Sequence, residues 1–198
     1  MGLKHFRKIR FFFSYSGKHQ IKMEQNFTPN PTLGRFQNHG YEYLSSIYRM
    51  KEEHDQLSSR GITPFIMPVK VLSVACLAIE EYLNVAGFRI DSNWKEFDHE
   101  TEPIRERLEY IYKLLEKPIS FETGIWKDVL ELFEMEKRIK KNSLGLIKYH
   151  QKEIPEIIKD ATKRYPIQLS QALAERAIEL LLNHSSLSFP LERVMNLV

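Results

Sequence analysis

The sequence PVKVLSVACLAIEEYLNVAG, residues 68–87, is the most hydrophobic part of the chain. Its apolar side chains recur at the three- and four-residue spacing of an α-helix and form a face wide enough to be buried on most sides. That face consists of Val71, Leu72, Ala75, Ala78, Ile79, Tyr82, Leu83 and Ala86. Because a glycine often follows the last residue of a helix, we expect Gly87 to act as the C-cap. The stretch therefore predicts a central, buried helix over 68–87.

Helical periodicity also extends to both sides of this stretch. It predicts helices over about 36–59, 102–116, 124–141, 155–163 and 167–184. The second of these opens at Thr101 or Glu102, with Pro103 in its first turn, and Leu169 is expected among the buried residues of the last. No run alternates between apolar and polar residues for more than a few positions. The sequence therefore predicts an all-α fold, an antiparallel up-and-down bundle of about five or six helices.

Residues 1–35 are expected to be an extension of a single bundle domain over 36–198. Residues 1–22 carry six Lys or Arg and no acid, which leaves 23 basic and 26 acidic residues in the rest of the chain. The basic and aromatic residues over 4–13 are typical of a segment that contacts a membrane surface or a phosphate backbone. The alternative is that translation starts at Met23, and we favour it. Pro29 and Pro31 disfavour helix before residue 36.

Composition excludes several classes of protein. Cys76 is the only cysteine, so neither an intramolecular disulfide nor a zinc site of several thiolates can form. The cysteine count favours a reducing compartment, and we expect a cytoplasmic protein. Charged residues make up 28% of the chain and no run approaches 18 apolar residues, so we expect no transmembrane segment. Outside the N-terminal segment, the mildly acidic chain has no general attraction for nucleic acid.

Motifs for metal, phosphate or nucleophile chemistry are nearly absent from the sequence. The one Glu-x-x-His pair is Glu96–His99, and it falls in an expected loop, within an acidic run that is typical of a solvated helix start. We therefore expect no metal site and no cofactor. Glu80 and Glu81 interrupt the apolar helix, and we expect one of them to pair with an Arg or Lys at the edge of the bundle. Trp94 and Trp126 are expected in the core, and the surface is expected to hold His54, His150 and His184.

Three short segments resemble the HEPN superfamily, a group of helical bundles that includes dimeric ribonucleases and accessory subunits. Residues 75–84 resemble the apolar helix of the family, with its embedded acid followed by Leu-Asn. Residues 114–117, Leu-Leu-Glu-Lys, resemble a family helix end, and Gly124-Ile125-Trp126 followed by Leu132-Phe133 resembles the approach to its Arg-x(4–6)-His motif. The resemblance covers about residues 40–184 and implies a helical bundle that forms dimers.

The residues that would carry out ribonuclease chemistry in that family are replaced in this chain. In the family pattern the Arg would fall on Glu136, the Asn on Lys137 and the His on Lys141. A glutamate repels phosphate, and a lysine is a poor general base at neutral pH unless it is strongly desolvated. We therefore expect no catalytic residues and interpret these three as degenerate motif positions.

The sequence favours a non-catalytic HEPN-like module that acts in self-association or partner binding. We expect a homodimer through the helix around 124–141 and its neighbours. One reason is that the HEPN resemblance implies dimers. The other is that one narrow apolar stripe does not need to bury as many large side chains as Trp126, Phe133 and Met135 provide. The alternative is a protein that processes RNA or binds nucleotides through non-standard residues. Its phosphate-facing candidates would be Arg105, Arg107, Arg138 and Lys140, together with Lys137 and Lys141.

Overall fold

The structure is a computed structural model, and it describes residues 11–12, 22–23, 31–62, 64–146 and 154–185. Most of these residues belong to six α-helices. The helices are α1 (Pro31–Ser59), α2 (Ile66–Ile90), α3 (Ile104–Leu114), α4 (Ile125–Leu146), α5 (Glu156–Arg164) and α6 (Ile167–Ser185). The strands β1 (Phe11–Phe12) and β2 (Lys22–Met23) form an antiparallel pair in which Phe11 lies opposite Met23. The predicted all-α bundle is confirmed, and the described residues contain no sheet of more than these two short strands.

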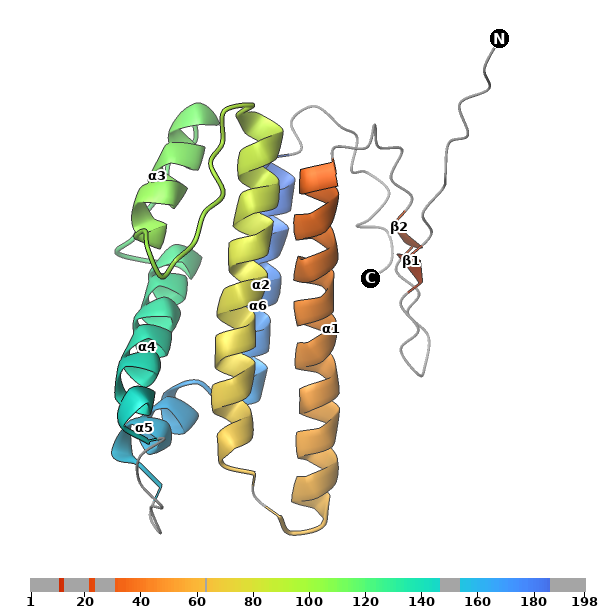
Figure 1. The fold of residues 1–198 in the computed structure, drawn as a ribbon, viewed down its shortest axis with the longest axis vertical. Helices are drawn as coiled ribbons and strands as arrows, with labels where there is room; N and C mark the ends of the chain where they lie inside the picture. Colours follow the sequence, from red (N-terminus) through yellow and green to blue (C-terminus); the bar gives the residue numbers. More distant parts are fainter. Residues whose placement is uncertain (1–10, 13–21, 24–30, 63, 147–153, 186–198) are drawn as a thin grey trace.

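The helix α2 is the centre of the bundle, as its hydrophobicity predicts. It contacts each of the other five helices, with its most extensive contacts to α1 and α6. Figure 1 shows α1 running antiparallel beside α2, with α6 behind α2. The helices α3 and α4 lie on the side of α2 that is opposite α1. Residues Val71, Leu72, Ala75, Ala78, Ile79, Leu83 and Ala86 of α2 are fully buried. None of the helices described has an apolar stretch long enough to cross a membrane.

The first helix begins five residues earlier than the sequence predicts. A proline is unfavourable inside a helix but suits its first position, where the missing N–H would have no partner and the fixed φ is helical. Pro31 occupies that first position in α1. The added turn places Leu33 and Phe36 in the core, and the Phe36 ring stacks on Phe88 of α2 with centroids 5.4 Å apart. The first turns of α1 are thus part of the bundle.

The ends of α2 and α3 differ from the predicted ones. Gly87 is an interior residue of α2, which continues to Ile90, so the predicted C-cap at Gly87 is wrong. Pro103 has an extended backbone, with ψ of 125°, and precedes α3 rather than lying within it. Thr101 and Glu102 instead donate their N–H groups to the carbonyl of Asp98 in a turn. The loop between α2 and α3 therefore runs from residue 91 to residue 103 and is longer than expected.

The remaining helices follow the prediction more closely. The helix α4 continues five residues beyond 141, since no proline interrupts it before Pro155, and α5 and α6 lie within one residue of their predicted ranges. Trp94 and Trp126 are buried, as predicted. Leu169, by contrast, is 41% exposed, because it lies on the outer side of the first turn of α6. The basic run over 4–10, His150 and the C-terminal residues 186–198 lie outside the described residues.

Candidate functional site

The loop between α2 and α3 is fixed to α2 by one buried amide. Asn84 Oδ1 accepts hydrogen bonds from the backbone N–H of Phe97, at 2.6 Å, and from the indole N–H of Trp94, at 3.0 Å. Its Nδ2 donates to the carbonyl of Phe97 at 3.0 Å. An amide that satisfies three buried polar groups compensates their removal from water. Asn84 thereby holds the loop in the position that brings His99 over α2.

A glycine makes room for this loop. The Trp94 ring lies so close to Gly87 that a Cβ there would be 2.1 Å from ring carbons Cδ2 and Cε2. No side chain fits in that gap, because non-bonded carbon atoms need about 3.5 Å. Gly87 therefore allows the Trp94 ring to approach the backbone of α2 closely, and this contact explains why a glycine lies inside the helix.

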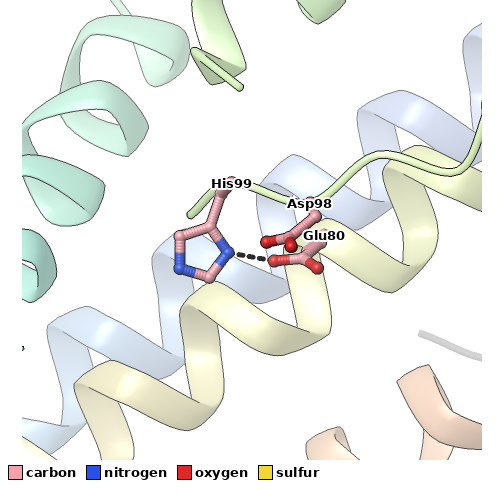
Figure 2. Close-up of side chains that lie close together, drawn as sticks. All are labelled: Glu80, Asp98 and His99. Carbon is pink, nitrogen blue, oxygen red and sulfur yellow. Dashed lines mark hydrogen bonds and ion pairs between the residues drawn. The ribbon is translucent and has the colours of Figure 1, made fainter. Parts of the chain in front are cut away.

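The imidazole of His99 lies between two carboxylates from different helices. Its Nδ1 contacts Oε2 of Glu80 on α2, as Figure 2 shows, and its Nε2 lies 3.5 Å from Oε2 of Glu136 on α4. The Phe133 ring of α4 packs against the imidazole edge to face, with centroids 5.1 Å apart. The side chain is 8% exposed. His99 thus joins α2, the loop and α4 at one point.

Glu136 is a buried acid inside the bundle, with 2% of its side chain exposed. Its Oε1 lies 3.1 Å from the ammonium of Lys140, one helical turn further along α4. Lys140 in turn donates to Glu100 at 2.5 Å. A buried carboxylate is costly unless cations and hydrogen bonds surround it. Lys140 and His99 supply that compensation for Glu136.

The polar contacts of this cluster are incomplete. Among the described residues, Glu136 Oε2 and His99 Nε2 have no hydrogen-bond partner of good geometry, although they lie next to each other. Most buried polar atoms in proteins do have such a partner. The pair is therefore an attraction between charges rather than a well-formed hydrogen bond.

Electrostatics favours a charged His99. Burial lowers its pKa, but the interactions with the carboxylates of Glu136 and Glu80 outweigh burial and raise the pKa to about 9. On α2, burial raises the pKa of Glu81 to about 7, partly opposed by His39 and reinforced by the negative charges of Glu80 and Glu96. In the absence of other ligands, His99 is a cation at neutral pH, and a protonated imidazole cannot accept a proton as a general base.

The same cluster contains ligand atoms suited to a metal ion. Glu80, Asp98 and His99 each offer one such atom, and these atoms lie within 4.8 Å of one another. Figure 2 shows the imidazole directed at the carboxylate of Glu80, with the carboxylate of Asp98 beside it; Glu80 belongs to α2 and the other two to the loop. Glu96, the partner that the Glu-x-x-His spacing indicated, is instead paired with Arg35 at 2.7 Å.

Sequence reasoning missed this cluster for identifiable reasons. The acidic run around His99 was interpreted as a solvated helix start, which is wrong for His99 because its side chain is buried. One of Glu80 and Glu81 was expected to pair with Arg or Lys, but both face histidines: Glu80 contacts His99, and Glu81 lies 3.6 Å from His39. The available signal was the pair of acids inside an apolar helix. It identified a polar site but not its partners.

The degenerate motif positions separate in space. Glu136 is buried, whereas Lys137 and Lys141 are exposed on the outer surface of α4. His184 is half-buried at the end of α6: its Nδ1 accepts a hydrogen bond from the hydroxyl of Tyr112 at 2.9 Å, and that hydroxyl accepts one from the indole N–H of Trp126. His54 is half-buried, with Nδ1 3.5 Å from a carboxylate oxygen of Asp55.

The candidate phosphate-facing cations contact groups of the chain itself. Arg107 pairs with Glu102 and lies over the Trp94 ring, and Arg105 lies over the Phe121 ring at 4.6 Å from its centroid. Arg138 lies 3.8 Å from Asp160. Lys140 lies between Glu100 and Glu136. The structure does not bring these four side chains together around one common point.

Comparisons of the chain with models of protein families, with curated proteins and with solved structures find no match.

Proposed function

We propose that the chain is a non-catalytic, HEPN-like helical module of the cytoplasm that acts in self-association or partner binding. The observation that carries this proposal is the separation of Glu136 from Lys141. Residues five apart on an α-helix are rotated by about 140° from each other. In agreement with this, Glu136 is buried while Lys141 is exposed. Residues at these two positions do not share a cleft within one chain.

The state of His99 supports the same proposal. Among the described residues it is the histidine that contacts the degenerate motif, since its Nε2 lies 3.5 Å from Glu136. The carboxylates of Glu136 and Glu80, one at each ring nitrogen, raise its pKa to about 9 despite burial, so the metal-free imidazole holds its proton at neutral pH. General-base catalysis works best with a pKa near the working pH. The only histidine in contact with the motif is, in the described structure, unsuited to start phosphodiester cleavage.

A homodimer remains part of the proposal, but through a different surface from the one predicted. Trp126, Phe133 and Met135 are all buried within the single chain, so the apolar side chains that motivated a contact through α4 are already packed. Among the described residues, exposed apolar side chains gather instead at the turn between α1 and α2. Ile62, Phe65 and Ile66 are each 51% exposed there. We propose that this turn contacts a second copy of the chain.

Ribonuclease assays test the non-catalytic part of the proposal. The full-length chain is incubated with single-stranded and structured RNA, beside a Lys141→Ala variant and a preparation treated with a chelator. We expect no cleavage above the level of a buffer control in any of the three. Turnover by the unchanged chain that disappears in Lys141→Ala would overturn the proposal and favour the RNA-processing alternative.

Light scattering coupled to size exclusion tests the dimer. We expect a species of twice 23.5 kDa at high micromolar concentration. Phe65→Ser is expected to shift the chain to monomer, while Leu114→Ser, which removes an exposed apolar residue from α3, leaves the dimer intact. A clean monomer for the unchanged chain contradicts self-association, and a dimer that survives Phe65→Ser contradicts the proposed surface.

A further inference from the structure

We propose that Glu80, Asp98 and His99 Nδ1 bind a divalent transition-metal ion of the zinc class, with Glu136 orienting the imidazole from its other side. The proposal is independent of the proposed dimer and concerns a structural ion that fastens the loop 91–103 to α2. It departs from the expectation of no metal site, which rested on Glu96 as the partner of His99.

The ligand atoms are close enough to share one ion. Zinc binds imidazole nitrogen and carboxylate oxygen at about 2.0–2.2 Å, so ligands arranged tetrahedrally around it lie about 3.4 Å apart. The three candidate atoms already lie within 4.8 Å of one another. Asp98 is exposed, so its carboxylate has room to adjust its distance to an ion. One imidazole with two carboxylates suits zinc and its first-row neighbours rather than magnesium, which prefers oxygen ligands alone.

The second observation is the buried carboxylate behind His99. A histidine that binds a metal through one ring nitrogen usually directs the other at a carboxylate or carbonyl, which fixes the ring and increases its basicity. Glu136 stands at that place, 2% exposed and 3.5 Å from Nε2. Its Oε2 has no hydrogen-bond partner among the described residues, which is unusual for an atom buried to this degree. When Nδ1 binds an ion, the neutral imidazole keeps its remaining proton on Nε2, where it faces this oxygen.

The charge around the site also favours a cation. Four carboxylates lie around His99: those of Glu80, Asp98, Glu100 and Glu136. The ammonium group of Lys140 pairs with two of them, Glu100 and Glu136. The charge of Glu80 also acts on Glu81, where it reinforces the rise in pKa that burial causes. A proton on His99 supplies one positive charge to this group. A divalent ion supplies two and displaces that proton from Nδ1.

Binding of an ion would have a structural consequence. Glu80 belongs to α2, whereas Asp98 and His99 belong to the loop, so the ion would add a link between two segments that Asn84 already joins through Trp94 and Phe97. A ligand that binds only the folded chain raises its stability by mass action. The ion therefore acts as a clamp, and the remaining coordination positions are left to water.

Titration of the full-length, chelator-treated chain with Zn²⁺ tests the proposal, with Mg²⁺ as the control ion. Calorimetry should show one high-affinity Zn²⁺ site per chain that Mg²⁺ does not fill. Co²⁺ provides a second readout, because its visible absorption reports nitrogen and oxygen ligands directly. Melting temperature should rise with Zn²⁺. An unchanged calorimetric baseline at millimolar Zn²⁺ would overturn the proposal.

Variants assign the ligands. Asp98→Asn keeps the side-chain oxygen that accepts the Glu100 N–H, so it preserves the turn while removing a charged ligand. It should weaken Zn²⁺ binding at least 10-fold. Glu136→Gln should weaken Zn²⁺ binding by about 10- to 100-fold, as the loss of a carboxylate that orients a ligating histidine does in other metalloproteins. Glu96→Gln, an acid of the same loop that pairs with Arg35, is the matched control and should leave binding unchanged. Affinity that is retained in Asp98→Asn and in Glu80→Gln would mean that Zn²⁺ binds elsewhere, and the proposal would be wrong.

Discussion

The indole ring of Trp94 occupies the space that a side chain on Gly87 would need. An added Cβ would lie 2.1 Å from two ring carbons and 2.5 Å from a third. The contact joins the loop to α2 one helical turn beyond Asn84, whose side chain binds the same indole through its N–H. The position of His99 therefore depends on two neighbouring residues of α2 that do not belong to the charged cluster.

Replacing Gly87 with alanine is expected to destabilise the chain by about 3 kcal/mol, because overpacking of a well-filled core costs about 1–3 kcal/mol and the clash here is with a rigid ring. The free energy of unfolding from urea titrations measures the effect.

Gly34→Ala is the matched control. Gly34 also lies within a helix, but a Cβ there would meet nothing within 4 Å. Because alanine favours helix over glycine, this variant should gain about 0.5 kcal/mol. Equal effects of the two substitutions would contradict the close approach of Trp94 to Gly87.

Asn84→Leu should lower the free energy of unfolding by about 3 kcal/mol. Leucine has a similar volume but leaves the Phe97 N–H and the Trp94 indole N–H without an acceptor, and each unsatisfied buried group costs about 1–3 kcal/mol. Asn93→Ala, in the exposed part of the same loop, should change stability by less than about 0.5 kcal/mol. Chemical denaturation of both variants checks the prediction, which fails if Asn84→Leu is as stable as Asn93→Ala.

Glu136→Gln is expected to destabilise the chelator-treated chain by about 3 kcal/mol. Removal of one member of a buried charge pair leaves its partners without compensation, and both His99 and Lys140 depend on this carboxylate. Glu134→Gln, on the exposed side of the same helix, should be nearly neutral. Thermal unfolding of the two variants measures both changes in stability. If Glu136→Gln unfolds at the same temperature as the unchanged chain, the charged cluster contributes nothing to folding.

Cys76 is expected to resist thiol reagents in the folded chain. Its side chain is fully buried, and burial, reinforced by the charge of Glu136, raises the thiol pKa well above its usual value. The thiolate is the reactive form, so both access and ionisation are suppressed. Labelling with an aromatic disulfide should therefore require denaturant, while in Ser58→Cys one thiol per chain should react at once. Rapid labelling of native Cys76 would show that the core around α2 opens readily.

The sequence predicted the bundle well because helix formation follows a local periodicity. The buried face of α2 could be identified residue by residue, since apolar spacing at 3.6 residues per turn has few alternative explanations. Helix ends were less predictable. A proline can break a helix or begin one, and a glycine can end a helix or make room for a neighbouring group inside it. Only the tertiary structure shows that Pro31 begins α1 and that Gly87 makes room for the Trp94 ring.

The charged cluster could not be predicted for a different reason. Glu80, His99 and Glu136 are separated by 19 and 37 positions, and no local pattern relates residues on α2, a loop and α4. Their approach depends on the path of the loop, which in turn depends on Asn84 and Gly87. The sequence did indicate that Glu80 and Glu81 were out of place in an apolar helix. The identity of their partners required the three-dimensional arrangement.

The hold of Asn84 on Phe97 also affects how the loop exchanges its amide hydrogens with deuterium from solvent. The Phe97 N–H points at a buried acceptor, so it can exchange only when the loop separates from α2. It should therefore exchange as slowly as amides in the middle of α2, although it belongs to no helix or strand. Lys95 and Glu96 beside it are exposed and should exchange quickly. A single slow amide among fast ones would mark the loop as part of the cooperative unit formed by α2.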